Sequence, residues 1–278
     1  MSCLYIIKQG MEGFTESEKK IGKYILSNKN EVINLSAQEL ADKVSVSAAG
    51  VVRFAKKIGF KGFTALKVEL AKDNEEEIVD FSEMISEDDD TKTMIKKAIK
   101  SNINTLEQTY KLINMNVIEE AINTIANAKK IYIYGIGASG LIALDFQYKL
   151  LRIKKDVIYN NDSHIQLAIA SHIESDDVAI GISYSGETKE INVAMNEAKT
   201  NGAKVIAITR YNNSTLSKIS DMTLYIPNQE KELRLGAIAS RMSALTLIDI
   251  LYLGIVKNDI SKTKDYITGT RRIIEKIK

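Results

Sequence analysis

Apolar residues in the first seventy positions recur three and four residues apart. Ile21, Tyr24 and Ile25 follow this spacing, and so do Leu40 and Val44. That period places the apolar side chains on one face of a helix, and no strand-like alternation interrupts it. The pattern therefore predicts an all-α N-terminal domain.

The second half of the chain has a different pattern, in which short β-branched or aromatic runs alternate with helical stretches. Strands are expected at 131–134, 156–159, 178–183, 204–209 and 222–226, and helices near 140–151, 163–172, 187–200 and 237–257. A helical lead-in near 92–128 and a closing helix near 260–277 complete this half. Such alternation is typical of βαβ units. It predicts a three-layer α/β domain, with helices covering both faces of a parallel sheet.

An acidic stretch separates the two patterns. Residues 73–90 hold ten acidic and no basic residues, whereas residues 1–72 hold 12 Lys/Arg against 7 Asp/Glu. So many like charges disfavour folding, which indicates a linker. We expect a first domain at 1–75, the acidic linker and the start of a connecting helix at 76–105, and a second domain at 106–278.

Composition excludes several classes of protein. A single cysteine, Cys3, permits neither a disulfide framework nor a cysteine-based metal site, and the two histidines, His164 and His172, make a zinc site improbable. No window approaches about 18 uninterrupted apolar residues, and the start lacks the order of a signal peptide. We expect a cytoplasmic protein without metal, cofactor or membrane contact.

Residues 37–59 have the spacing of two helices that pack across a tight turn. Ser36 and Ser47 can cap the two helices, Ser45 occupies the turn, and small Ala41 suits the point where the helices touch. This pattern predicts a helix-turn-helix, although an amphipathic hairpin with a solvated lysine face has the same periodicity.

The second helix of this pair would present a basic surface to DNA. Side chains expected to face base edges in the major groove are Ser47, Ala48, Ala49 and Arg53, with Arg53 reading guanine directly. Lys56, Lys57 and Lys61 are better placed for phosphates, which position a protein without specifying sequence.

This N-terminal segment resembles the MurR/RpiR regulators. Residues 14–70 align with those proteins without a gap, and Val52–Phe63 match their shared run VRF-K-LGF-GF. The sequence departs at Gly50, where the family usually has threonine, and at Ala48, which is often polar there. The resemblance implies a sugar isomerase (SIS) domain behind the helix-turn-helix.

Two loops of the second domain carry the pattern of an anion site. The first predicted strand is followed by Gly135, Gly137, Ser139 and Gly140, which match GxGxxG at the start of a helix. Such a loop lets backbone N–H groups meet a phosphate. A purely structural turn also needs glycine, and a nucleotide-dependent oxidoreductase shares the motif, so this loop alone leaves those alternatives open.

The second loop is more specific. After the third predicted strand the chain reads Ser183-Tyr184-Ser185-Gly186-Glu187-Thr188 and enters another helix. Hydroxyl groups, backbone amides and the helix dipole can converge there on one compact dianion, which favours a terminal phosphate over the pyrophosphate of a dinucleotide. Simple helix capping by Ser or Thr is the alternative.

Both motifs resemble those of SIS domains, over about residues 106–257. The resemblance implies that Ser139, Ser183, Ser185 and Thr188 hold the phosphate of a phosphosugar. Tyr184 and Glu187 lie inside the loop with less defined roles.

Some SIS domains are aldose-ketose isomerases, which is the alternative function. Glu232 falls roughly where aminosugar-phosphate isomerases keep a carboxylate base, so it joins the ligand-site candidates, although a solvated surface charge is the favoured explanation. Arg234 could contact ligand or a partner subunit. Because an isomerase has no use for the first 72 residues, we favour a non-catalytic regulator that binds operator DNA as a homodimer or homotetramer and responds to a phosphosugar effector.

Overall fold

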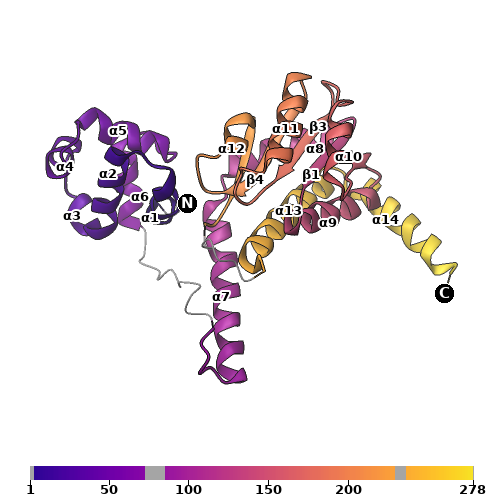
Figure 1. Ribbon diagram of the computed structural model, residues 1–278, viewed down its shortest axis with the longest axis horizontal. Helices are drawn as coiled ribbons and strands as arrows, with labels where there is room; N and C mark the ends of the chain where they lie inside the picture. Colours follow the sequence, from indigo (N-terminus) through magenta and orange to yellow (C-terminus); the bar gives the residue numbers. More distant parts are fainter. Residues whose placement is uncertain (1–2, 73–84, 229–235, 278) are drawn as a thin grey trace.

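The computed structural model describes residues 3–72, 85–228 and 236–277. Two domains lie side by side, an all-helical one and an α/β one, and the long helix α7 (Thr91–Leu112) extends below both in the view of Figure 1. The fold class predicted from the sequence is confirmed.

The N-terminal domain packs short helices around one apolar core. Its elements are α1 (Cys3–Gly10), the 3-10 turn η1 (Met11–Gly13), α2 (Glu16–Ser27), α3 (Lys29–Val32), α4 (Ala37–Val44), α5 (Ala48–Lys57) and α6 (Phe63–Lys72). Ile21, Leu40, Phe54 and Leu66 are fully buried in this core. The Phe14 and Phe54 rings meet edge to face, with centroids 5.1 Å apart.

The C-terminal domain is built on a five-stranded parallel sheet in the order β2-β1-β3-β4-β5. The strands are β1 (Ile131–Gly135), β2 (Val157–Ile158), β3 (Val178–Ile182), β4 (Lys204–Arg210) and β5 (Met222–Ile226). The helices are α7, α8 (Met115–Asn127), α9 (Ala138–Arg152), α10 (Ser163–Ala170), α11 (Lys189–Thr200), α12 (Thr215–Ile219), α13 (Ile238–Asn258) and α14 (Ile260–Glu275).

Helices cover both faces of this sheet. Alternate strand residues such as Ile133 and Ile180 face α8, α9 and α13, whereas Tyr134 and Ala207 face the layer that contains α10, α11 and α12. Strands buried on both faces read as continuous apolar runs, and β1 and β3, buried at every residue, follow this pattern.

Some element boundaries differ from the expected ones. The predicted lead-in helix 92–128 is two helices, because the chain turns at Ile113 and the Asn114 side chain caps α8 by accepting from the N–H groups of Asn116 and Val117. Strand β2 is shorter than expected, and α12 was not anticipated.

Helix α13 is long and apolar enough to cross a membrane by length and hydropathy, with 44% of its most apolar window buried. Ala244, Leu247, Ile248 and Leu251 on this helix pack into the core beside the sheet. This packing is that of a core helix.

Candidate functional site

The strand order reverses direction between β1 and β3. From β1 the chain passes to β2 on one side and then returns to β3 on the other, where Gly135 lies opposite Ile182 in the register. Ligands of open α/β sheets bind beyond the carboxyl ends of the strands at such a switch point. Both loops singled out by their motifs begin there.

The first loop, between β1 and α9, requires its glycines. Gly137 has φ +62° and precedes the first residue of α9. A Cβ on Gly135 would lie 2.8 Å from the Ser139 carbonyl oxygen, and one on Gly140 would lie 2.6 Å from the Tyr159 hydroxyl. The backbone therefore turns tightly into the helix, which brings half-buried Ser139 and the first N–H groups of α9 to the edge of the sheet.

The second loop, residues 183–188, holds its hydroxyls around Gly186. The Ser183 and Thr188 hydroxyl oxygens are 2.9 Å apart, and the Ser183 oxygen accepts from the Gly186 N–H at 3.2 Å. The Ser185 oxygen accepts from the Glu187 N–H at 3.2 Å. Gly186 has φ +70°, and a Cβ there would lie 2.2 Å from the Ser214 hydroxyl oxygen, so this position admits no other residue without rearrangement.

Glu187 has a structural role in the same loop. Its carboxylate accepts from the Thr215 N–H at 2.9 Å and from the Thr215 hydroxyl at 2.7 Å, and these hydrogen bonds hold its pKa below the usual range. Glu187 thus ties the loop to the first turn of α12.

Two amides that support the loops were not identified from the sequence. Buried Gln166 on α10 accepts from the Gly135 N–H at 3.1 Å and donates to the Gly135 carbonyl at 2.9 Å. Asn192 on α11 donates to the Gly186 carbonyl at 3.2 Å. Their only signal in the sequence was a polar residue on an otherwise apolar helix face.

Three buried polar atoms beside the second loop have no hydrogen-bond partner in the described part of the chain. They are Asn192 Oδ1, Arg210 Nε and Asn212 Oδ1. Buried polar atoms in native proteins are nearly always satisfied, by protein, water or ligand. The surroundings of the loop are therefore suited to a polar ligand.

The other candidates lie elsewhere. His164 and His172 are exposed, one on α10 and one just after it. Glu232 and Arg234 lie outside the described residues. Tyr184 is buried, and its ring lies under the Arg210 guanidinium at 5.8 Å from the ring centroid.

Arg210 also joins the second loop to the N-terminal domain. Its guanidinium lies 3.4 Å from the Glu12 carboxylate of η1 and donates to the Asn228 side-chain oxygen at 3.0 Å. The Asn228 N–H donates to the Gln9 side chain of α1. Asn212, two residues after Arg210, donates to the Ser185 carbonyl at 3.1 Å. This segment of the chain therefore contacts both the second loop and the domain interface.

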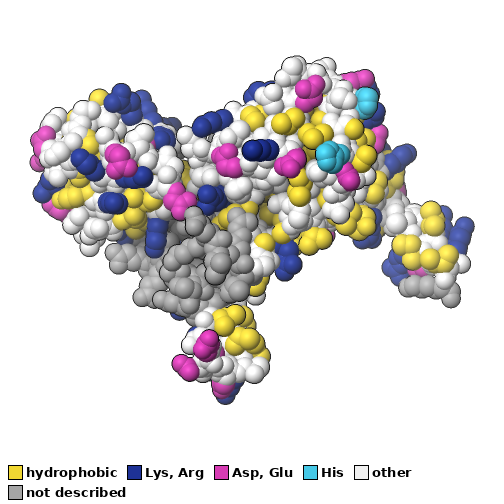
Figure 2. Space-filling view, in the orientation of Figure 1, with side chains coloured by type: hydrophobic (Ala, Val, Ile, Leu, Met, Phe, Trp, Pro, Cys, Tyr) yellow, Lys and Arg dark blue, Asp and Glu magenta, His cyan; other side chains and the backbone are white. Residues whose placement is uncertain are grey.

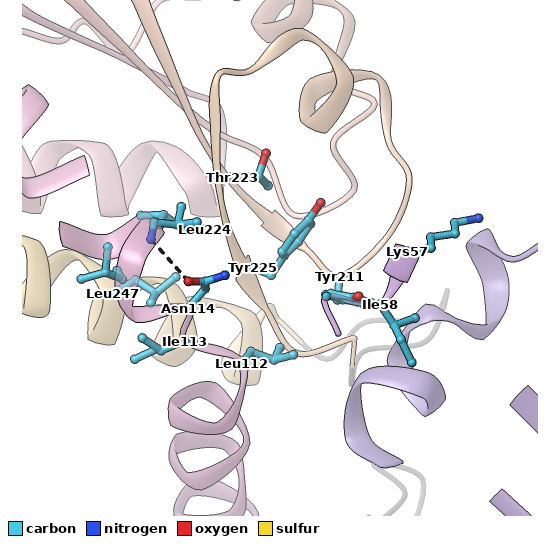
Figure 3. A pocket seen from close by; sticks show the side chains of 13 residues that line it. Lys57, Ile58, Leu112, Ile113, Asn114, Tyr211, Thr223, Leu224, Tyr225 and Leu247 are labelled. Carbon is cyan, nitrogen blue, oxygen red and sulfur yellow. Dashed lines mark hydrogen bonds between the residues drawn. The ribbon is translucent and has the colours of Figure 1, made fainter. Parts of the chain in front are cut away.

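A cavity of about 180 Å³ adjoins this interface (Figure 3). Ile58 at the end of α5 lines one side, Leu112 and Leu247 line the other, and the rings of Tyr211 and Tyr225 meet edge to face between them, 4.8 Å apart. Burial raises the pKa of both tyrosines, so their hydroxyls stay neutral. The domains therefore touch through these polar contacts and through Leu112, Tyr211 and Tyr225, which pack against the apolar core of the N-terminal domain beside the cavity.

The helix-turn-helix forms as the spacing predicted. The Ser36 hydroxyl caps α4 in a reciprocal box with Glu39, Ser45 takes the left-handed conformation in the turn, and the Ser47 oxygen accepts from the Gly50 N–H at 3.0 Å. Val51 and Phe54 are buried on the inner face of α5. These caps and this burial fix the angle at which α5 leaves the domain.

The outer face of α5 carries most of the predicted DNA contacts. Ala49, Arg53 and Lys56 are exposed there, Ala48 is half-buried at the helix start, and Ser47 and Lys61 are exposed just beyond the two helix ends. Lys57 differs, because its ammonium group pairs with Glu18 at 2.6 Å and lies over the Phe14 ring.

Comparison with known proteins agrees with this architecture. Residues 1–77 match the model of the rpiR-family helix-turn-helix domain, and residues 124–254 match that of the SIS domain. The chain belongs to the RpiR family of helix-turn-helix transcription regulators. An uncharacterized HTH-type transcriptional regulator of Caldanaerobacter subterraneus is 37% identical over 98% of this chain and 96% of its own. The regulator YfhH of Escherichia coli is 31% identical over the full length of both.

One solved structure matches both domains of this chain. The Vibrio vulnificus NanR protein complexed with ManNAc-6P is 27% identical, covers 99% of this chain and 98% of its own, and superposes with a TM-score of 0.64. The sugar isomerase domain of an RpiR transcription factor from Sphaerobacter thermophilus covers 64% of this chain with a TM-score of 0.57 at 18% identity, which bears on the fold alone.

Proposed function

We propose that this RpiR-family regulator binds a phosphorylated sugar between the 135–140 and 183–188 loops, and that the bound sugar sets its affinity for operator DNA. The observation that carries the proposal is the hydroxyl cluster of Ser183, Ser185 and Thr188 around a required glycine, at the switch point of the sheet. Ser139 and the start of α9 complete the phosphate anchor from the neighbouring strand.

Two further observations favour this ligand class. The unpartnered atoms of Asn192, Arg210 and Asn212 can be satisfied by the hydroxyls of a sugar held next to its phosphate. ManNAc-6P, present in the NanR structure, is itself a phosphorylated sugar. The domain senses this ligand and does not transform it, since the relatives that span the whole chain are named as transcription regulators.

The N-terminal domain binds operator DNA through α5. Arg53 reads bases, with Ser47, Ala48 and Ala49 beside it, while Lys56 and Lys61 contact phosphates. We assign Lys57 a smaller part, because Glu18 already neutralises its charge. We expect the protein to act in the cytoplasm, where it would meet its operator. We expect it to bind DNA as a homodimer or homotetramer.

Ligand and DNA communicate through Arg210. A phosphosugar in the second loop lies beside the Tyr184 ring and the guanidinium that holds Glu12, so binding changes how the N-terminal domain is held. Relative motion of the domains of one chain is the usual expectation unless their interface is large and hydrophobic. Coupling between two sites of about 1–3 kcal/mol is enough for a switch.

The test measures operator binding by fluorescence anisotropy with and without a panel of sugar phosphates, at one salt concentration. Ser183→Ala/Thr188→Val should abolish the response to the effective sugar phosphate and its binding in calorimetry. Ser171→Ala, an exposed hydroxyl at the end of α10, is the matched control and should respond as the parent does. An unaltered response in the double variant would contradict the proposed site, and NAD binding would favour the dinucleotide alternative.

A further inference from the structure

The N-terminal half of α7 has an apolar face that the described residues of its own chain leave exposed. The described buried residues of this helix begin only at Thr105. Before them Ile95, Ile99 and Ile103 are 49%, 53% and 53% exposed. This part of the helix projects away from both domains in Figure 1, and yellow side chains are visible at its lower end in Figure 2.

The exposed residues form one continuous stripe. Positions four apart lie on the same helix face, and Tyr110, 57% exposed, extends the face of Ile99 and Ile103 by two further turns. We call these four residues, Ile95, Ile99, Ile103 and Tyr110, the α7 stripe. A projecting helical segment gains little stability from its own backbone, and an apolar stripe along it indicates a packing partner.

We propose that the α7 stripe packs antiparallel against the same stripe of a second copy of this chain, with Ile99 at the twofold axis. This deepens the homo-oligomer of the proposed function and rests on it. In that arrangement Ile95 of one copy faces Ile103 of the other. The same apolar residues therefore meet each other when the second helix runs in the opposite direction, as an interface with twofold symmetry requires.

The charges beside the stripe favour the antiparallel direction. Pairing about Ile99 brings Lys92 next to Glu107 of the second copy. A parallel pairing would instead set Lys92 against Lys92 and Lys96 against Lys96, which is repulsive. Lys97 takes no part in either direction, because it pairs with Asp89 of its own chain at 2.6 Å.

Cysteine cross-linking tests both the contact and its direction. The native Cys3 is buried, so the full-length parent protein serves as the background and should not react with a short bis-maleimide. Ile99→Cys should cross-link to itself. Ile95→Cys and Ile103→Cys should each fail alone and cross-link when mixed, because helix axes in contact lie about 8–10 Å apart. Met94→Cys, exposed on the opposite face of α7, is the negative control.

The oligomeric state gives an independent readout. In sedimentation, Ile99→Glu should raise the dimer dissociation constant at least tenfold, while Met94→Glu leaves it unchanged and circular dichroism shows both variants folded. Self-cross-linking of Ile95→Cys would overturn the proposal, and so would a lack of cross-linking in every stripe variant. A dimer dissociation constant unaffected by Ile99→Glu would also overturn it. Such a dimer would still leave the proposed regulator intact, since ligand and operator binding are measured separately.

Discussion

Gly186 is the residue on which the second loop depends most. Its positive φ and the close approach of the Ser214 hydroxyl leave no room for a side chain. Gly186→Ala should lower the free energy of unfolding by about 1–3 kcal/mol, the usual range for strained or overpacked positions, and should abolish sugar-phosphate binding. Denaturant unfolding and calorimetry measure the two effects.

Gly269→Ala is the matched control for that substitution. Nothing lies within 4 Å of a Cβ there, and the residue is inside α14, so alanine should stabilise the protein by about 0.5–1 kcal/mol. If both alanine variants behave alike, the tight packing around Gly186 is not what holds the loop.

Glu187 gives a prediction about pH. Its folded-state pKa lies below its ordinary value of 4.5, so its charge contributes stability above that value and loses the contribution as the pH falls through the lower, folded pKa. Glu187→Gln should therefore melt at a lower temperature than the parent at pH 7. The difference should disappear in acid below the folded pKa, since a protonated glutamic acid and a glutamine are then equally neutral. A difference that is independent of pH would mean that the charge is not involved.

At the scale of the element, the caps and buried residues of α5 orient the face that we propose reads DNA. The buried Val51 and Phe54 orient the helix, and the exposed Arg53 and Lys56 stand on its outer side. The chemistry of the two cations differs, because a guanidinium can pair with a base edge whereas an ammonium mainly neutralises phosphate.

Substitution of each of the two cations of α5 should therefore affect DNA binding in a different way. Arg53→Ala should cost about 1–3 kcal/mol on operator DNA and much less on random DNA. Lys56→Ala should weaken binding to both sequences alike. It should also reduce the slope of log affinity against log salt concentration by about one. Equal losses on both DNAs for Arg53→Ala would contradict base reading. Anisotropy titrations at three salt concentrations separate the outcomes.

At the scale of the whole molecule, the Glu12–Arg210 pair is the direct ionic link between the domains in the described parts of the chain. Arg210→Glu should reduce the ratio of operator affinities with and without sugar phosphate, and Glu12→Arg should do the same. The double variant, which restores an ion pair with reversed polarity, should recover part of that ratio. Because Arg210 also lies beside the proposed sugar site, calorimetry measures the affinity of each variant for the sugar phosphate, and the operator ratio is taken at a saturating concentration of it. A ratio unchanged in all three variants would remove this pair from the coupling route.

Much of the fold could be predicted because its signals are local. The period of three and four in the N-terminal domain, the apolar strands buried on both faces, and the serine caps at Ser36 and Ser47 all depend on residues within one element. The same is true of the glycine and hydroxyl pattern of residues 183–188. The sequence by itself therefore determined the two domain types and the residue types of the proposed phosphate anchor.

Other features required the tertiary structure, because they depend on residues far apart in the chain. Gln166 supports a loop thirty-one positions earlier, Lys57 is neutralised by Glu18, and Arg210 meets Glu12 across the domain interface. No periodicity or motif encodes such contacts, since each arises when separately folded elements pack together. The sequence determined which groups the protein offers to the proposed phosphate and DNA sites, whereas packing decided which of those groups are exposed and which already have a partner.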